Sequence, residues 1–84
     1  MSEGYAAHLD QCVAKIDAVG LNCPLPLLKT KKALATVSSG ERVYLCATDP
    51  NSIRDLTAYA TQAGHGLLVA EESGGRYHFI IEKK

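Results

Sequence analysis

The sequence contains the same pair of patterns twice. In each pair, a segment of alternating apolar and polar residues comes before a segment whose apolar residues recur with helical spacing. The alternation over residues 14–18 predicts a half-buried strand, and the apolar stripe within residues 24–37 predicts a helix. The same order returns with a strand over residues 43–47 and a helix that ends at Gly64. Strands joined through a helix pair in parallel by a right-handed crossover. Residues 14–64 therefore predict two parallel strands with a helix after each.

The end of the chain has the pattern of a hairpin. Residues 67–72 and 76–83 have strand character, and Ser73-Gly74-Gly75 between them predicts a tight turn and an antiparallel pair. The full order is β-α-β-α-β-β. We expect an α/β protein: a two-layer sandwich in which two helices cover one face of a mixed four-stranded sheet.

The length allows one small domain. With 84 residues, 46% of them hydrophobic, the chain can bury one core. We assign this domain to residues 13–84. Residues 1–12 show no sustained periodicity and predict a flexible N-terminal tail. No apolar run approaches the roughly 20 residues that span a bilayer, and the start has no signal-peptide pattern. We expect a cytoplasmic protein with no membrane partner.

The charges balance overall but not locally. Nine basic residues offset nine acidic ones, which argues against a protein that binds nucleic acid directly. Residues 18–40, however, contain no acid and three lysines, Lys29, Lys31 and Lys32. This window predicts a basic surface on the first helix.

The chain has three cysteines, Cys12, Cys23 and Cys46, and none has the Cys-x-x-Cys spacing of a redox pair or zinc knuckle. In a reducing compartment we expect three free thiols. Cys46 lies in a strand, which favours a buried and inert thiol. The histidines are scattered and no glycine-rich phosphate loop is present, so we expect no metal site and no cofactor.

Cys23 stands where the first strand gives way to the first helix. Free N–H groups and a partial positive charge at a helix start stabilise an anion. A thiol there is expected to ionise below the free value of about 8.5. Pro24 and Pro26 fix the backbone beside it, and Lys29 and Lys32 would add positive charge. These features predict an exposed nucleophile.

The start of the second helix holds further candidates. Asp49 is expected to cap the helix, and Pro50 suits its first position. Arg54 and Asp55 are expected on the helix surface. Together with Lys29 and Lys32, they are our candidates for an edge that binds a partner protein.

Two motifs carry a resemblance to a known family. The first motif is Cys23-Pro24-Leu25-Pro26, and the second is a block that begins Thr48-Asp49-Pro50. With this separation between them, the chain resembles the TusA/SirA-type family of small sulfur carriers. The resemblance covers residues 14–84. The resemblance implies that Cys23 carries a persulfide, with Pro24, Pro26 and Asp49 in positioning roles. It implies that a cysteine desulfurase or another protein donates the sulfur and that an acceptor protein takes it onward, for example toward tRNA thiolation. Such a carrier acts within a relay rather than as a stand-alone enzyme.

Two other functions remain open at this point. The surface around Lys29 and Lys32 would also suit a non-catalytic module that binds RNA or protein. Alternatively, a disulfide between Cys12 and Cys23 would make the chain a redox regulator. The donor, the acceptor, the pathway and the oligomeric state are not determined by the residues.

Overall fold

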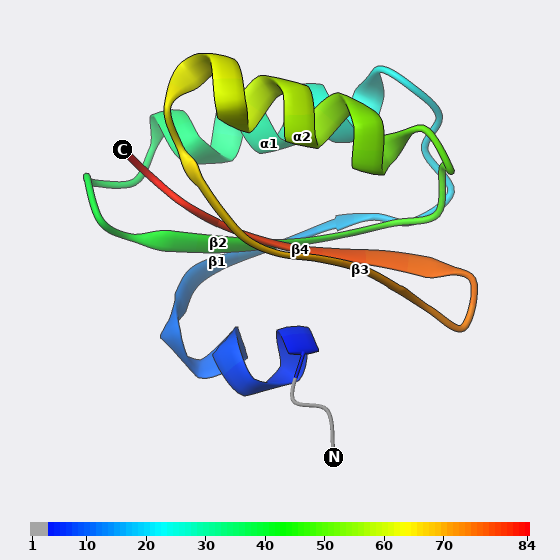
Figure 1. Cartoon of the computed structure of the whole chain (residues 1–84), viewed down its shortest axis with the longest axis horizontal. Coiled ribbons are helices and arrows are strands. Elements are labelled where there is room, and N and C mark those ends of the chain that lie inside the picture. The colour runs from blue at the N-terminus through cyan, green and yellow to red at the C-terminus, as the bar shows by residue number, and fades with distance from the viewer. Residues whose placement is uncertain (1–3) are drawn as a thin grey trace.

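The computed structural model describes residues 4–84 and contains the predicted order of strands and helices. The elements are η1 (Gly4–Gln11), β1 (Cys12–Ala18), α1 (Leu25–Ala35), β2 (Arg42–Ala47), α2 (Ser52–Ala63), β3 (Gly66–Ser73) and β4 (Arg76–Glu82). The strands form one sheet in the order β1-β2-β4-β3. β1 and β2 are parallel, while β4 is antiparallel to both β2 and β3. Figure 1 shows α1 and α2 together on one face of this sheet. The predicted fold class is confirmed.

The core lies between the helices and the sheet. Leu45 of β2, Phe79 of β4 and Leu56 of α2 are fully buried in one cluster. Leu34 of α1 packs in a second cluster with Val43 of β2. Full burial of side chains of this size stabilises a fold by about 1.5–3 kcal/mol each. These contacts fix both helices on the sheet, and with them the loops that precede the helices.

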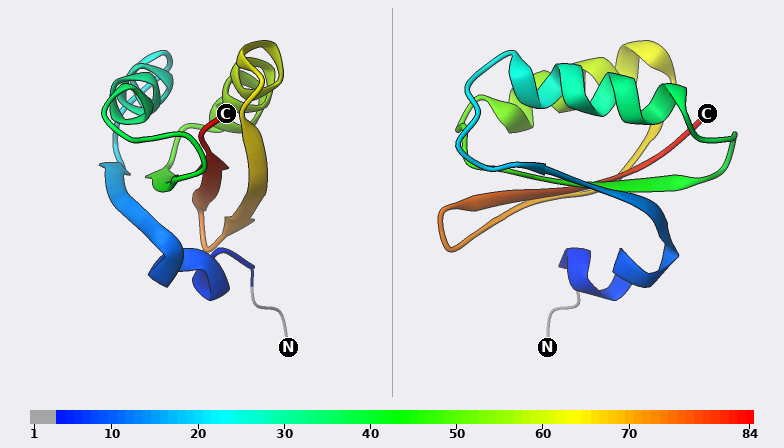
Figure 2. Two further views of the ribbon diagram at one scale, coloured as in Figure 1. Left: turned by 90° about the vertical axis from the view of Figure 1, so that its left-hand side faces the viewer. Right: turned by 180° about the vertical axis from the view of Figure 1, so that it is seen from behind.

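A short 3₁₀ helix, η1, occupies most of the segment for which we predicted no regular structure. It lies on the sheet face opposite α1 and α2 (Figure 2). The ring of Tyr5 stacks on that of His78 with centroids 3.8 Å apart, and the Tyr5 N–H donates to Glu71 at 3.1 Å. The partners are more than 60 residues away in the chain, so the local pattern of residues 4–11 gives no sign of the contact.

The second helix begins later than predicted. Its first residue is Ser52 and its N-cap is Asn51, so Pro50 lies in the preceding turn and Asp49 is not the cap. Asp49 still contacts the helix start, because its Oδ1 accepts the Asn51 N–H at 3.1 Å. The helix ends as expected at Gly64, which has φ of +80°. This left-handed conformation suits glycine.

Among residues 4–84, no helix combines the length and the apolar character that a membrane crossing requires.

Candidate functional site

Cys23 lies in the loop between β1 and α1, directly before the N-cap Pro24. Because β1 and β2 are parallel and in register at Ala18 and Ala47, the loops that follow them leave the sheet at the same edge. In open α/β sheets, this edge at the carboxyl ends of the strands is where ligands bind. The two loops are tied together, since the Gly20 N–H donates to Thr48 Oγ1 at 2.9 Å.

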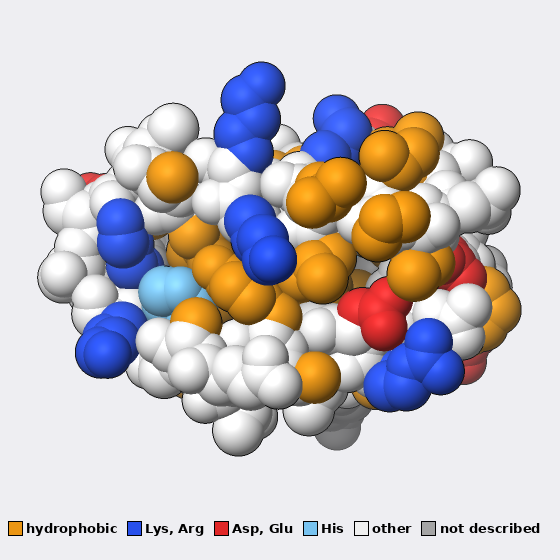
Figure 3. Space-filling view, turned by 90° about the horizontal axis from the view of Figure 1, so that it is seen from above, with side chains coloured by type: hydrophobic (Ala, Val, Ile, Leu, Met, Phe, Trp, Pro, Cys, Tyr) orange, Lys and Arg blue, Asp and Glu red, His pale blue; other side chains and the backbone are white. Residues whose placement is uncertain are grey.

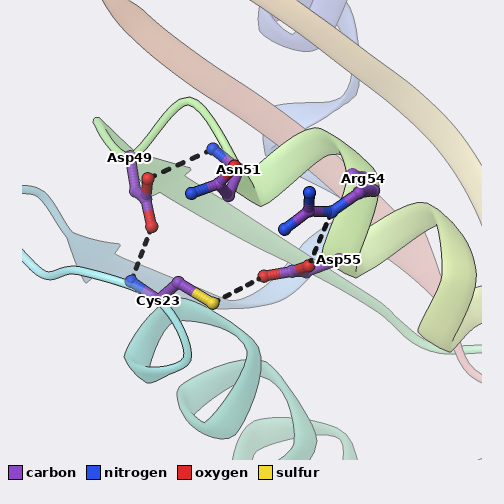
Figure 4. Close-up of polar contacts among 5 residues, drawn as sticks. All are labelled: Cys23, Asp49, Asn51, Arg54 and Asp55. Carbon is purple, nitrogen blue, oxygen red and sulfur yellow. Dashed lines mark hydrogen bonds and ion pairs between the residues drawn. The ribbon is translucent and has the colours of Figure 1, made fainter.

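Asp49 joins the Cys23 loop to the start of α2. Its carboxylate is buried, with 9% of the residue exposed. One oxygen, Oδ2, accepts the Cys23 N–H at 2.5 Å, and the other accepts the Asn51 N–H at 3.1 Å. Figure 4 shows the bridge. These two hydrogen bonds fix the backbone of Cys23 relative to α2. We had predicted only a helix cap for Asp49.

The thiol of Cys23 is exposed and points at α2. Its Sγ donates a hydrogen bond to Oδ2 of Asp55 at 2.9 Å. The other oxygen of Asp55 receives a contact from Nε of Arg54 at 3.4 Å. Asp55 and Arg54, which we expected only as surface residues for a partner, therefore belong to the immediate surroundings of the thiol.

These surroundings raise the pKa of the Cys23 thiol above its ordinary value, so the predicted depression is wrong. The hydrogen bond to Asp55 is the main cause, because it stabilises the protonated thiol. Some loss of hydration at the sulfur and the negative charges of Asp55 and Asp49 also raise the pKa, and the charge of Arg54 lowers it.

The start of α1 has few free N–H groups that could stabilise a negative charge on the sulfur. Pro24 and Pro26 have no N–H, and the Leu25 N–H donates to the carbonyl of Asn22 at 2.8 Å. Three of the four residues after Cys23 thus have no N–H available for an anion. We predicted anion stabilisation from the position of Cys23 alone, and the hydrogen bonding of this turn removes most of it.

Lys29 and Lys32 are exposed on α1. Neither is among the charges that shift the pKa of Cys23, which come instead from Asp55, Asp49 and Arg54. The charge count along the chain was misleading here. Residues 24–40, which follow Cys23 in the sequence, include lysines and no acid. The fold instead places two carboxylates from the second half of the chain, Asp49 and Asp55, in contact with Cys23.

The other two cysteines lie away from this site, and all three are free. Cys46 is 8% exposed in β2, as we predicted for a buried thiol. Cys12 begins β1, whose length of seven residues places it roughly 20 Å from the strand end that leads to Cys23. A disulfide needs Cα atoms about 4.4–6.8 Å apart, so this fold does not permit the Cys12–Cys23 bond of the redox alternative.

Cys23 lines neither of the two best-formed hollows within residues 4–84. A hollow of about 320 Å³ lies on the η1 side of the sheet and is lined in part by Lys15, Tyr44, Cys46 and Arg76. Within residues 4–84, no group of three or more His, Cys, Asp or Glu side chains is arranged to hold a metal ion. The site is an open corner with one thiol and two carboxylates.

Comparison with known proteins decides the family. Residues 14–83 match the family model of sulfurtransferase TusA. The chain belongs to the TusA family. This confirms the resemblance carried by the two motifs and makes the chain a sulfur carrier, which implies contact with proteins that donate and accept sulfur.

Individual relatives agree with this assignment. The sulfur carrier protein TusA of Allochromatium vinosum is 49% identical over 77 residues, which cover 92% of this chain and 97% of the relative. The putative sulfur carrier protein YrkI of Bacillus subtilis is 41% identical over 68 residues, covering 81% and 91%. The crystal structure of a SirA-like protein from Desulfitobacterium hafniense superposes with a TM-score of 0.73 at 30% identity, covering 83% of this chain and 96% of that one. The match to the TusA family thus covers nearly the whole domain.

Proposed function

We propose that Cys23 is the residue on which this sulfur carrier holds its cargo, as a persulfide. The observation that carries the proposal is the placement of Cys23. It is the exposed thiol at the edge where the two helix-preceding loops meet. Cys46 is buried, and Cys12 lies at the other end of β1.

The chemistry requires two exchanges of the same kind. The Cys23 thiolate attacks the outer sulfur of a persulfide on the donor protein, whose S–S bond breaks and whose cysteine leaves as a thiolate. The acceptor later attacks the outer sulfur on Cys23 in the same way. Each step conserves atoms and oxidation state, so neither a cofactor nor a metal ion takes part.

We assign the remaining site residues to positioning the thiol and to contacting partner proteins during sulfur transfer. Pro24 and Pro26 stiffen the backbone on which the thiol stands, and Asp49 fixes that backbone through the Cys23 N–H. Lys29, Lys32 and Arg54 are exposed and are available to partner proteins. We take the donor to be a cysteine desulfurase and the compartment to be the cytoplasm, where a reducing environment keeps three free thiols unpaired. Delivery toward tRNA thiolation is one relay that this chemistry serves.

Loading with sulfur tests the proposal directly. The protein is incubated with a cysteine desulfurase and cysteine, and its intact mass is measured with and without a reductant. We expect a gain of one sulfur atom that the reductant removes. The Cys23→Ser variant should gain none, whereas the Cys12→Ser variant should load as the wild type does. Loading of Cys23→Ser, or no loading of the wild type by any protein persulfide, would refute the assignment.

A further inference from the structure

In the protein without a donor, a hydrogen bond favours the protonated form of the Cys23 thiol. A thiolate is the nucleophile in sulfur transfer, yet the thiol of Cys23 donates a hydrogen bond to Asp55 Oδ2 at 2.9 Å. The carboxylate of Asp49 lies on the other side, bound to the Cys23 N–H. Figure 4 shows Asp55 at the sulfur and Asp49 at the backbone N–H of the same residue, so two negative charges lie near a sulfur that must itself become negative. Something has to change at Asp55 when a donor docks.

We propose that Asp55 keeps the Cys23 thiol protonated through this hydrogen bond, a role that we call the latch. A cationic side chain of the sulfur donor then breaks the hydrogen bond by pairing with the Asp55 carboxylate. The inference rests on the proposed role of Cys23. It adds a positioning residue to that role and states a property of the partner: a Lys or Arg presented beside its persulfide.

The carboxylate of Asp55 is accessible to such a group. Its side chain is 20% exposed, and among residues 4–84 only Arg54 forms an ion pair with it. That contact is long, at 3.4 Å, and comes from a side chain that is itself 73% exposed. Exposed ion pairs of this kind contribute little, so a well-placed cation of a docked protein can replace Arg54 or add to it. Bidentate pairing by an arginine would occupy both oxygens of Asp55, including the one that now accepts the thiol.

The surface beside the latch suits a protein partner. Leu25 and Leu28, in the first two turns of α1, are 46% and 49% exposed. Figure 3 shows hydrophobic side chains gathered on the helix face of the molecule next to acidic and basic ones. A docked partner that covers these leucines would also exclude water from Asp55, which strengthens its attraction to a cation.

The steps balance without another reactant. When the partner's cation takes up Asp55 Oδ2, the hydrogen bond from Sγ is lost and the thiol releases its proton to water. The thiolate attacks the outer sulfur of the donor persulfide, forming one S–S bond as the donor's own S–S bond breaks. The donor cysteine leaves as a thiolate and is protonated by water. Asp55, Asp49 and Arg54 are the charged groups that face the sulfur throughout.

Two small disulfides of opposite charge test the latch without any partner protein. Cystamine carries two positive charges and dithiodiglycolate two negative ones, and both form a mixed disulfide with Cys23 that intact mass detects. In the Cys12→Ser background at neutral pH, we expect cystamine to react faster by roughly three- to tenfold. Asp55→Asn should reduce this ratio several-fold, and Asp55→Glu should restore part of it. Asp10→Asn, the same substitution in η1 on the other side of the sheet, should leave it unchanged.

The outcome separates the latch from the proposed function. If Asp55→Asn and Asp10→Asn give the same ratio as the parent protein, the latch is wrong, even if Cys23 still loads with sulfur from a desulfurase. If Cys23 does not load at all, the carrier assignment fails whatever the ratio is. With a desulfurase as donor, the latch further requires Asp55→Asn to need a higher desulfurase concentration than Asp10→Asn for half-maximal loading rate, because the docking cation has lost its partner, whatever the lower pKa of Cys23 does to the maximal rate. Equal half-maximal desulfurase concentrations for the two variants would also contradict it.

Discussion

The thiol of Cys23 and the carboxylate of Asp55 are joined by a hydrogen bond of 2.9 Å, although 32 positions of the chain separate them. The bond joins the loop before α1 to the first turn of α2. It sets the protonation of the thiol through a residue that a sequence motif alone would place on the surface of the second helix.

Replacing Asp55 by Asn should lower the pKa of Cys23. The main cause of the raised pKa is the hydrogen bond to the Asp55 carboxylate, and its negative charge adds to it. In the variant, the thiolate should therefore be present at lower pH. The measurement is the pH dependence of alkylation by iodoacetamide, a neutral reagent, in the Cys12→Ser background. The midpoint should shift to lower pH in Asp55→Asn and to higher pH in Arg54→Gln, since Arg54 lowers the pKa. A midpoint below that of a free cysteine in the parent protein would contradict the structure.

Replacing Asp49 by Ala should destabilise the fold as well as the site. The substitution leaves the N–H groups of Cys23 and Asn51 without their acceptor. Loss of such hydrogen bonds to a buried carboxylate costs about 1–3 kcal/mol. Urea unfolding should show a lower midpoint with an unchanged slope. Asp17→Ala is the matched control, because Asp17 accepts only the local Val19 N–H at an exposed position. A midpoint for Asp49→Ala no lower than that of the control would mean that the bridge does not hold the two loops together.

Replacing Tyr5 by Ala should release η1 from the sheet. The variant loses the stack on His78 and the weaker one on Tyr44, whose centroid is 5.5 Å from that of Tyr5. Aromatic pairs are worth about 0.5–1.5 kcal/mol beyond their buried area. We expect a reduced free energy of unfolding and faster amide exchange in residues 4–11. Ala7→Ser, at an exposed position of the same helix, should change neither. Wild-type exchange in Tyr5→Ala would show that the stack does not fix η1.

Stability should fall as the pH drops toward 5, because of His78. Burial lowers the pKa of His78 below its ordinary value of 6.5, with Arg76 acting in the same direction and Glu71 opposing. The unfolded chain then binds a proton at a pH where the folded protein does not, so protonation favours unfolding. The urea midpoint should decrease between pH 7.5 and 5.5. The decrease should be smaller in His78→Gln, which has no group that titrates at this position. An identical pH dependence in the two proteins would rule out His78 as the cause.

The strands and helices could be predicted because their signals are local. The alternation in β1 and β2 and the apolar stripes of α1 and α2 reflect which side of each element faces the core, and burial of that side decides the fold. The start of α2 was placed too early because Asp49 and Pro50 have the chemistry of a helix start. The fold uses Asp49 to hold the Cys23 N–H instead. The segment before β1 was missed because its stability depends on Tyr5 meeting a distant strand.

The position of the cysteine that we propose as the sulfur-carrying residue is fixed by the amino-acid sequence, since Cys23 lies in a strand-to-helix loop and Pro24 and Pro26 follow it. Its electrostatic setting is not. Charge along the chain placed lysines near Cys23, whereas pairing of β1 with β2 brings the start of α2 alongside and sets Asp49 and Asp55 within hydrogen-bonding distance of the cysteine. Electrostatic interactions act through space over a few ångströms. The sequence by itself therefore determined which thiol is presented, and only the tertiary structure decided whether that thiol rests as an anion or as a protonated group held by a carboxylate.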